Sequence, residues 1–168
     1  MVAVLVMDKN EFSKKVLEAE QTLYRVSKSI LLQDEDCEDA VQEAVLKAYS
    51  KRNSLREEKY FKTWLTRILI NECCRLLRTK KQEVSYEDYF QEEQAESNQY
   101  SELYEAILKL DIKHRMPIIL FYMEGYSVNE IARLLRVPSG TVKSRLSKGR
   151  KQLKILLEDE VEYNEEYI

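Results

Sequence analysis

Hydroxyl-bearing and cationic side chains dominate one stretch of this chain, between residues 141 and 151. Amines and guanidinium groups bind phosphate oxygens, and guanidinium and hydroxyl groups also donate hydrogen bonds to base edges. The members of the set are Thr141, Lys143, Ser144, Arg145, Ser147, Lys148, Arg150 and Lys151. No carboxylate interrupts them, so their combined field is positive. This chemistry indicates nucleic-acid binding, and the alternative is an ordinary solvated basic face on an amphipathic helix.

A helix is expected to carry these side chains, because the apolar residues among them recur at spacings of three and four. The buried face would consist of Val142, Leu146, Gly149, Leu153 and Leu156. Upstream, Ser127 and Glu130 have the spacing of a capping box at the start of a shorter helix. Pro138 cannot continue that helix, so the chain must turn there, with Ser139 as a candidate cap for the next one. A short helix, a turn and a cationic helix predict a helix-turn-helix, which places one helix in a DNA groove.

Charge is segregated along the chain, although the net charge is only −3. Residues 1–81 hold 16 basic and 13 acidic groups, whereas residues 82–105 hold 8 acidic groups and no basic one. Residues 106–157 hold 11 basic and 3 acidic groups, and residues 158–168 hold 6 acidic groups. The balances are therefore +3, −8, +8 and −6. The sequence pI near 5.5 argues against nucleic-acid binding, but the local charge argues for it.

The composition narrows the class of protein. With 168 residues, 44% of them apolar, and only 3 glycines and 2 prolines, the chain predicts one helical domain or two small ones. No apolar run approaches the roughly 20 residues that span a membrane, and no signal peptide is recognisable. We therefore expect a cytoplasmic protein without direct membrane insertion. Three unpaired cysteines and a single histidine predict no metal site, no cofactor and no catalytic site.

Hydrophobic periodicity predicts helices at residues 9–32, 35–52 and 59–78, and after an acidic stretch at 101–110 and 112–124. Pro117 should kink the last of these or mark its first turn. The acidic stretch lacks a clean helical period, which favours a linker. A weak amphipathic helix packed through its aromatic residues is the alternative.

The predicted fold is all-α, with two small helical domains joined by the acidic linker. The predicted boundaries are 8–80 for the first domain, 81–101 for the linker and 102–157 for the second domain. Residues 158–168 form an acidic tail, read as a frayed end or a partner contact.

Two sets of motifs resemble the sigma-70 family of bacterial RNA polymerase sigma factors. DAVQEA at 39–44, FKTWL at 61–65 and Asn71 are similar to region 2 of that family. The EGYS run at 124–127 and GTVKSRL at 140–146 are similar to region 4. Because only these two regions are present, the chain resembles the extracytoplasmic-function (ECF) group. The resemblance covers roughly residues 10 to 157.

The resemblance implies a promoter-recognition subunit of bacterial RNA polymerase. Its first domain would bind the polymerase core and the minus-ten element, including the non-template single strand. Its second domain would bind the double-stranded minus-thirty-five element. The family also implies an inhibitory partner, an anti-sigma factor of the kind often anchored in the membrane. The alternatives left open are a stand-alone helix-turn-helix regulator and an adaptor whose basic helix binds an acidic protein.

Each role falls on a defined set of residues. Asp39, Gln42 and Glu43 share one helical face at i, i+3 and i+4, which in the family docks on the clamp helices of the largest polymerase subunit. Solvated acids near a helix start are the alternative. The minus-ten set is Asn53, Ser54, Arg56, Lys62, Arg67, Asn71, Arg75 and Arg78. The minus-thirty-five set is Ser139, Thr141, Lys143, Ser144, Arg145, Lys148 and Arg150.

The loop at 53–60 departs from the family pattern. Leu55 and Glu57 stand where many relatives carry an aromatic residue and a glycine in the loop that captures a flipped base. The departure leaves open which base is preferred. Trp64 invites a base-stacking role, but its spacing with Phe61 and Ile68 favours a place in the core.

Overall fold

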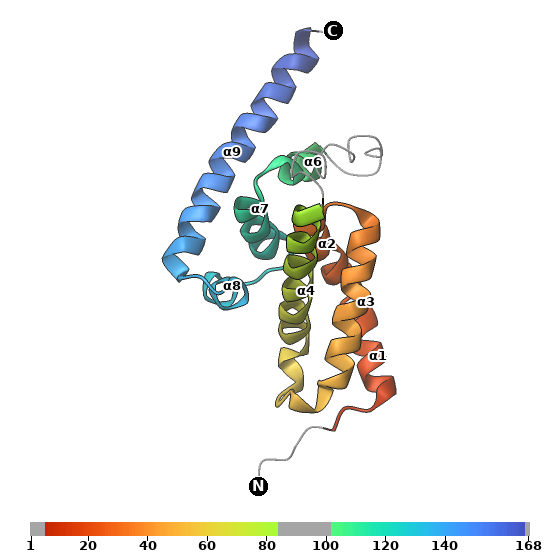
Figure 1. The fold of residues 1–168 in the computed structure, drawn as a ribbon. Helices are drawn as coiled ribbons and strands as arrows, with labels where there is room; N and C mark the ends of the chain where they lie inside the picture. The colour runs from red at the N-terminus through yellow and green to blue at the C-terminus, as the bar shows by residue number, and fades with distance from the viewer. Residues whose placement is uncertain (1–5, 84–101, 167–168) are drawn as a thin grey trace. The chain divides into compact units, whose positions relative to one another are not determined.

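The computed structural model describes residues 6–83 and 102–166, and in these ranges every regular element is helical. The chain separates into two compact units, Met1–Glu92 and Glu93–Ile168 (Figure 1). An all-α chain with two domains was predicted and is confirmed. Most of the predicted linker lies outside the described residues, as do the aromatic residues of its alternative reading.

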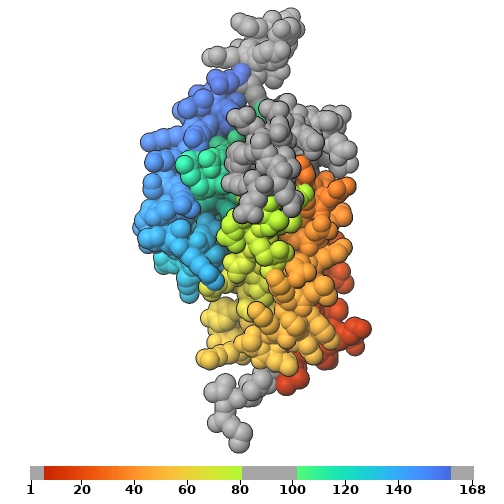
Figure 2. Space-filling model, viewed as in Figure 1, coloured from red at the N-terminus to blue at the C-terminus, as the bar shows by residue number. Residues whose placement is uncertain are grey.

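The first unit packs three helices around one core. They are α2 (Glu20–Leu31), α3 (Asp34–Ser50) and α4 (Phe61–Glu83), with α1 (Lys9–Glu18) against α2. Short 3₁₀ turns, η1 (Arg52–Ser54) and η2 (Glu58–Tyr60), connect α3 to α4. Figure 2 shows the side chains of α3 (orange) and α4 (yellow to green) meeting along one face of this unit. Three alanines of α3 (Ala40, Ala44 and Ala48) are buried, and their small size lets α3 approach its neighbours closely.

The prediction of one helix over residues 9–32 is wrong, because the chain breaks at Ala19. The Ala19 backbone has φ −91° and ψ 0°, and its N–H contacts the carbonyls of Lys15 and Val16. The break directs Phe12 of α1 onto the rings of Tyr49 and Phe61, at centroid distances of 5.2 and 5.6 Å. No glycine or proline marks this bend, so periodicity alone runs through it.

The joint between α2 and α3 is strained. Leu32 has φ 64° and ψ −45°, and the N–H of Gln33 donates to the carbonyl of Leu31 at 2.7 Å. This is a three-residue γ-turn with positive φ, a conformation that leucine rarely adopts. The Leu32 side chain is buried, so core packing compensates the backbone strain.

The second unit contains α6 (Glu102–Lys109), α7 (Ile112–Ile118), α8 (Val128–Leu135) and α9 (Ser139–Glu166). The buried guanidinium of Arg115 donates through Nη1 to the carbonyls of Leu108 and Leu110, at 2.7 and 3.0 Å. Leu108 lies in the last turn of α6 and Leu110 just after it, so Arg115 ties the end of α6 to α7. Helix α9 continues to Glu166 and so includes most of the predicted acidic tail.

Pro117 lies inside α7, near its end, and a π-helical segment, η4 (Ile119–Met123), follows at once. The N–H of Glu124 accordingly donates to the carbonyl of Ile119, five residues back, at 3.1 Å. Proline disturbs a helix on its N-terminal side, at the carbonyl four residues earlier, so the widened turn after Ile119 is not a direct effect of Pro117. Pro117 lies beyond the first turn of α7, so the expectation that it marks a first turn is wrong.

Candidate nucleic-acid and polymerase interfaces

The helix-turn-helix predicted from the sequence is formed by α8 and α9. The Ser127 hydroxyl accepts from the N–H of Glu130 at 3.2 Å, and the Glu130 carboxylate accepts from the N–H of Ser127 at 2.8 Å. This completes the predicted capping box, and the backbone hydrogen bond lowers the pKa of Glu130. Helix α8 ends at Arg136, which has φ 55° in the left-handed region and turns the chain toward Pro138.

Helix α9 begins at Ser139 itself. The carbonyl of Pro138 accepts from the N–H groups of Thr141 and Val142 at 3.0 and 3.2 Å. Ser139 therefore lies in the first turn of α9, and the expectation that it caps the helix is wrong.

The buried face of α9 is the predicted one at its N-terminal end. Val142 and Leu146 are fully enclosed, and Gly149 packs directly on α7. A Cβ placed on Gly149 would lie 3.1 Å from Cγ1 of Ile118 and 3.5 Å from Cβ of His114. Glycine therefore sets how closely α9 approaches α7, and this packing determines which face of α9 points outward.

The predicted minus-thirty-five residues are distributed on the outer side of α9 and its flanks. Thr141 and Arg145 are half-buried beside the core face. Arg150 differs from the rest, because its Nη1 donates to the hydroxyl of Tyr122 on η4 at 3.3 Å. The exposed members are Ser139, Lys143, Ser144, Lys148 and Arg150.

His114 lies beneath this basic helix. It is 6% exposed, and its Nδ1 has no hydrogen-bond partner among the described residues. Burial lowers the pKa of His114, and the charges of Lys113, Lys148 and Arg145 lower it further, whereas Asp111 raises it. The imidazole is therefore neutral at physiological pH and supports the α7–α9 packing.

The acidic face of the first unit lies on α3. Asp39 and Gln42 are exposed, and the Glu43 side chain is 45% exposed. Positions i, i+3 and i+4 bring the three side chains onto one strip of the helix surface, as the sequence predicted. Lys47 lies one turn further on, with its Nζ 3.7 Å from the Glu43 carboxylate.

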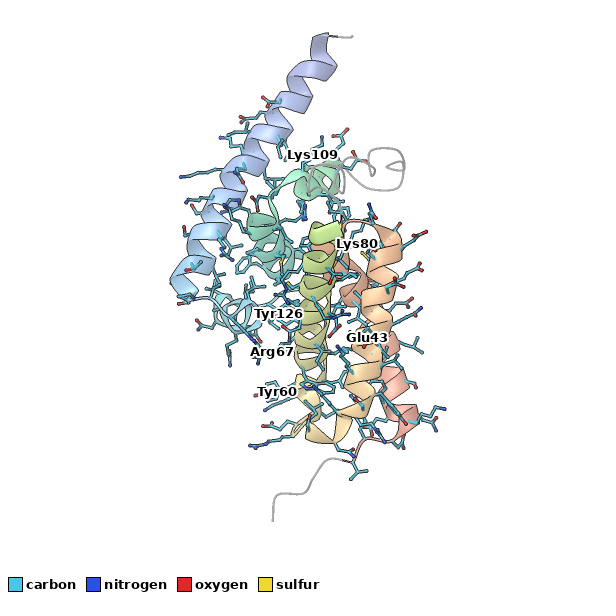
Figure 3. The ribbon with its side chains drawn as sticks, in the orientation of Figure 1. Glu43, Tyr60, Arg67, Lys80, Lys109 and Tyr126 are labelled. Atoms are coloured by element: carbon cyan, nitrogen blue, oxygen red, sulfur yellow. The ribbon has the colours of Figure 1, made fainter. Side chains whose placement is uncertain are left out.

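A cationic face lies on α4. Arg67, Asn71, Arg75 and Arg78 are all exposed and recur at intervals of four, four and three residues. Figure 3 shows Arg67 projecting from the side of α4 that faces away from α3. Lys62 is also exposed, but five residues before Arg67 it belongs to another face of the helix.

Glu72, a buried residue of α4, holds part of the cationic face in place. Its side chain is 8% exposed and accepts hydrogen bonds from Lys47 of α3 and from Nε of Arg75. Burial alone would raise the pKa of Glu72, but these two hydrogen bonds and the two positive charges lower it. Arg75 is thus held against α4 by an ionised carboxylate.

The connection between α3 and α4 is pinned at two points. Leu55 is buried, and Arg52 donates to the carbonyls of Met7 and Tyr49 while its guanidinium lies 4.2 Å from the centre of the Tyr49 ring. The predicted site residues of this loop, Asn53, Ser54 and Arg56, are exposed. The Ser54 hydroxyl donates to the carbonyl of Lys51 at 2.7 Å, so it also stabilises η1.

The sequence reasoning overlooked three residues at these faces. Tyr60, the last residue of η2, is 51% exposed, and Figure 3 shows it on the same side of the unit as Arg67. Leu46 is 66% exposed and lies on the acidic face of α3. Glu72 could have been noticed from its i, i+3 spacing to Arg75. Leu46 could have been noticed because it is apolar but does not fall on the periodic buried face of α3. Trp64 is half-buried, with its ring centroid 5.9 Å from that of Phe61.

The three cysteines are the remaining candidates for chemistry. Cys37 and Cys73 are buried and Cys74 is half-buried, all as free thiols, and burial raises the pKa of Cys73 far above its ordinary value. Within residues 6–83 and 102–166, no group of histidine, cysteine and acidic side chains could hold a metal ion. None of the helices in these ranges is long and apolar enough to cross a membrane.

Comparison with known proteins explains this pair of units. Residues 16–83 match the family described as Sigma-70 region 2, and residues 100–153 match Sigma-70, region 4. The chain is 30% identical over 154 residues to the ECF RNA polymerase sigma factor SigM of Mycobacterium tuberculosis (strain H37Rv), covering 89% of this chain and 79% of that protein. The chain belongs to the ECF RNA polymerase sigma factors.

Other relatives of this ECF sigma factor agree. SigW of Bacillus subtilis (strain 168) is 29% identical over 176 residues, which cover 90% of this chain and 91% of SigW. Among solved structures, the sigma factor RpoE from Bartonella quintana, in complex with the anti-sigma factor NepR, has a TM-score of 0.73 and 27% identity. That match covers 89% of this chain and 98% of RpoE. CnrH, in complex with the cytosolic domain of CnrY, shares the fold at a TM-score of 0.66, 22% identity and 90% coverage of both chains.

Proposed function

We propose that this ECF sigma factor directs bacterial core RNA polymerase to promoters through the faces described on α3, α4 and α9. The observation that carries the proposal is the presence, in one chain, of an acidic face on α3 and a helix-turn-helix whose second helix is cationic outside. A stand-alone regulator would need only the helix-turn-helix. The match of residues 16–83 to sigma region 2 therefore disfavours that alternative, and an adaptor that binds only an acidic protein.

The acidic face, Asp39, Gln42 and Glu43, is proposed to dock on the core polymerase. Two carboxylates and an amide on one strip can pair with basic and amide groups of a facing helix. Since these side chains are exposed or half-exposed and lie outside the core, their substitution should leave the fold intact.

The two DNA elements are proposed to bind on different helices. On α4, Arg67, Asn71, Arg75 and Arg78 would follow the backbone of the separated non-template strand, with the η1 loop contributing Asn53, Ser54 and Arg56. On α9, the minus-thirty-five set would enter the major groove of intact duplex. Lys62 remains a candidate phosphate contact off the main α4 face.

Energetics limit what the subunit does alone. Opening about ten base pairs costs roughly 14 kcal/mol at about 1.4 kcal/mol per stacking step. Capturing one or two unpaired bases returns roughly 1–3 kcal/mol each. The deficit is several-fold, so we propose that the polymerase supplies the remaining free energy and that the sigma factor selects where opening occurs.

Further parts of the proposal follow from the family. NepR and CnrY accompany two of the similar structures, so an anti-sigma factor is proposed to restrain this chain, and the ECF group suggests a response to envelope or extracellular stress. A membrane-anchored anti-sigma factor would keep the chain inactive until that signal arrives. The site of action would be the cytoplasm, where the polymerase works, and the chain would bind rather than catalyse.

Binding to core polymerase and run-off transcription test the proposal together. The full chain should bind core enzyme and start transcripts at defined promoters in a promoter library. A variant carrying D39N, Q42A and E43Q should lose both activities, whereas Glu18→Gln, an exposed acid on α1, should retain them. Tight operator binding by the chain alone, without transcription from added core, would instead support the stand-alone regulator.

A further inference from the structure

Leu46 is an exposed leucine on a helix whose other large apolar side chains are wholly or partly buried. Its side chain is 66% exposed, and among the described residues it is the only large hydrophobic side chain of α3 that is exposed. A single exposed leucine is common on protein surfaces and indicates no function by itself. The position of Leu46 relative to its neighbours on α3 does suggest a function.

Leu46 continues the acidic face of α3. Asp39, Gln42, Glu43 and Leu46 stand at i, i+3, i+4 and i+7, which is the repeat of one strip along a helix. At about 1.5 Å per residue the strip is roughly 10 Å long. A partner helix that contacts the two carboxylates would therefore meet the leucine within the same footprint.

The nearest cation on α3 is drawn away from this strip. Lys47 pairs with Glu72 of α4, a carboxylate 8% exposed, and is farther from Glu43, at 3.7 Å. Its charge is thus partly neutralised from the α4 side, where it joins the helices. The outer strip keeps its acidic character beside the isobutyl group of Leu46.

We propose that Leu46 is the apolar anchor of the polymerase-docking face, and that it enters an apolar hollow bordered by basic groups on the core enzyme. The inference rests on the proposed function. Interfaces gain most of their affinity from a few apolar or aromatic side chains near the centre, surrounded by polar groups that orient the partners. Here the acids supply orientation and salt-sensitive attraction, and Leu46 supplies attraction that salt does not screen.

The experiment measures the dissociation constant of the full chain for core polymerase at several salt concentrations. Leu46→Ala should bind about tenfold more weakly at every salt concentration, a loss of about 1.4 kcal/mol at 25 °C. Leu46→Met, which keeps an apolar side chain of similar volume, should bind within about threefold of the original chain. Leu17→Ala is the matched control, because Leu17 is 70% exposed and lies on α1, away from the strip.

Each outcome decides one point. Glu43→Gln should reduce the salt dependence of binding, whereas Leu46→Ala should leave that dependence unchanged. If Leu46→Ala binds as tightly as the original chain, or if Leu17→Ala loses as much affinity, the anchor is refuted while polymerase docking stands. If the unmodified chain does not bind core enzyme at all, the proposed function fails and the anchor with it.

Discussion

The carboxylate of Glu72 accepts a hydrogen bond from Nε of Arg75 at 3.0 Å, and its other oxygen accepts from Lys47 of α3. One nearly buried acid thus joins α3 to α4 and fixes an arginine of the proposed strand-binding face. The acidic face on α3 and the cationic face on α4 consequently share a structural support.

Replacing Glu72 by glutamine should lower the free energy of unfolding by about 1–2 kcal/mol, because glutamine has one acceptor oxygen, so one of the two hydrogen bonds is lost and the other no longer joins opposite charges. Urea denaturation measures this, and Glu43→Gln, a half-exposed acid, should change stability by less than about 0.5 kcal/mol. Since the fold lowers the pKa of Glu72, its contribution is present above its ordinary pKa near 4.5 and disappears as the pH falls below it. Equal losses in the two variants would contradict the anchoring role.

Gly149 should not tolerate a methyl group. Gly149→Ala places a Cβ 3.1 Å from the buried Ile118, and we expect a loss of about 1–3 kcal/mol despite the better helix propensity of alanine. Gly140→Ala is the control, because no atom lies within 4 Å of its Cβ position, and it should be neutral or stabilising by up to about 1 kcal/mol. Thermal unfolding of the two variants distinguishes the steric effect of the new methyl group from the change in helix propensity. Similar melting temperatures for both variants would refute the close approach of α9 to α7 at Gly149.

Acidification should weaken the second unit through His114. Because its pKa in the fold lies below the ordinary value of 6.5, the unfolded chain binds the proton more readily. The stabilising effect of the neutral imidazole is complete above pH 6.5 and is lost as the pH falls below that value. Denaturation measured from about pH 8 to about pH 5.5 should show this decline, and His114→Gln should flatten it. An unchanged pH profile in the variant would assign the decline to other groups.

Two cations of α9 should differ in what their loss does to promoter binding. Lys148→Ala should weaken binding of the polymerase–sigma complex to all promoters alike and reduce the salt slope by about 1. Arg145→Ala should cost about 1–3 kcal/mol only where the upstream element is intact. Lys154→Ala is the control, since Lys154 pairs with Glu158 at 3.7 Å and lies beyond the predicted contacts. Titrating polymerase–sigma complexes of the three variants against promoters with intact and scrambled upstream elements distinguishes these effects. Identical behaviour of the three variants would refute the assignment of Lys148 to a phosphate and Arg145 to a base.

Most local signals were read correctly from the sequence, the Ser139 cap excepted, and signals that depend on packing were not. The Ser127–Glu130 capping box depends on four consecutive residues, so its spacing was sufficient. The bend at Ala19 and the positive φ of Leu32 arise from burial against neighbouring helices, and no glycine or proline announces them. The pairing of Glu72 with Arg75 could be seen in their i, i+3 spacing, but its hydrogen bond with Lys47 became visible only once α3 and α4 were known to pack together, because Lys47 lies 25 residues away in the sequence. The residues of the interfaces were chosen by motif and spacing, and their roles remain predictions.

Arg115 has a consequence for how such a chain can be altered. Its guanidinium binds the carbonyls of Leu108, in the last turn of α6, and of Leu110, just after it, so the end of α6 is fixed from within the second unit. The helix-turn-helix unit is in this respect independent of the segment before it. That segment could be shortened, lengthened or exchanged with that of a relative, and the unit would keep its fold.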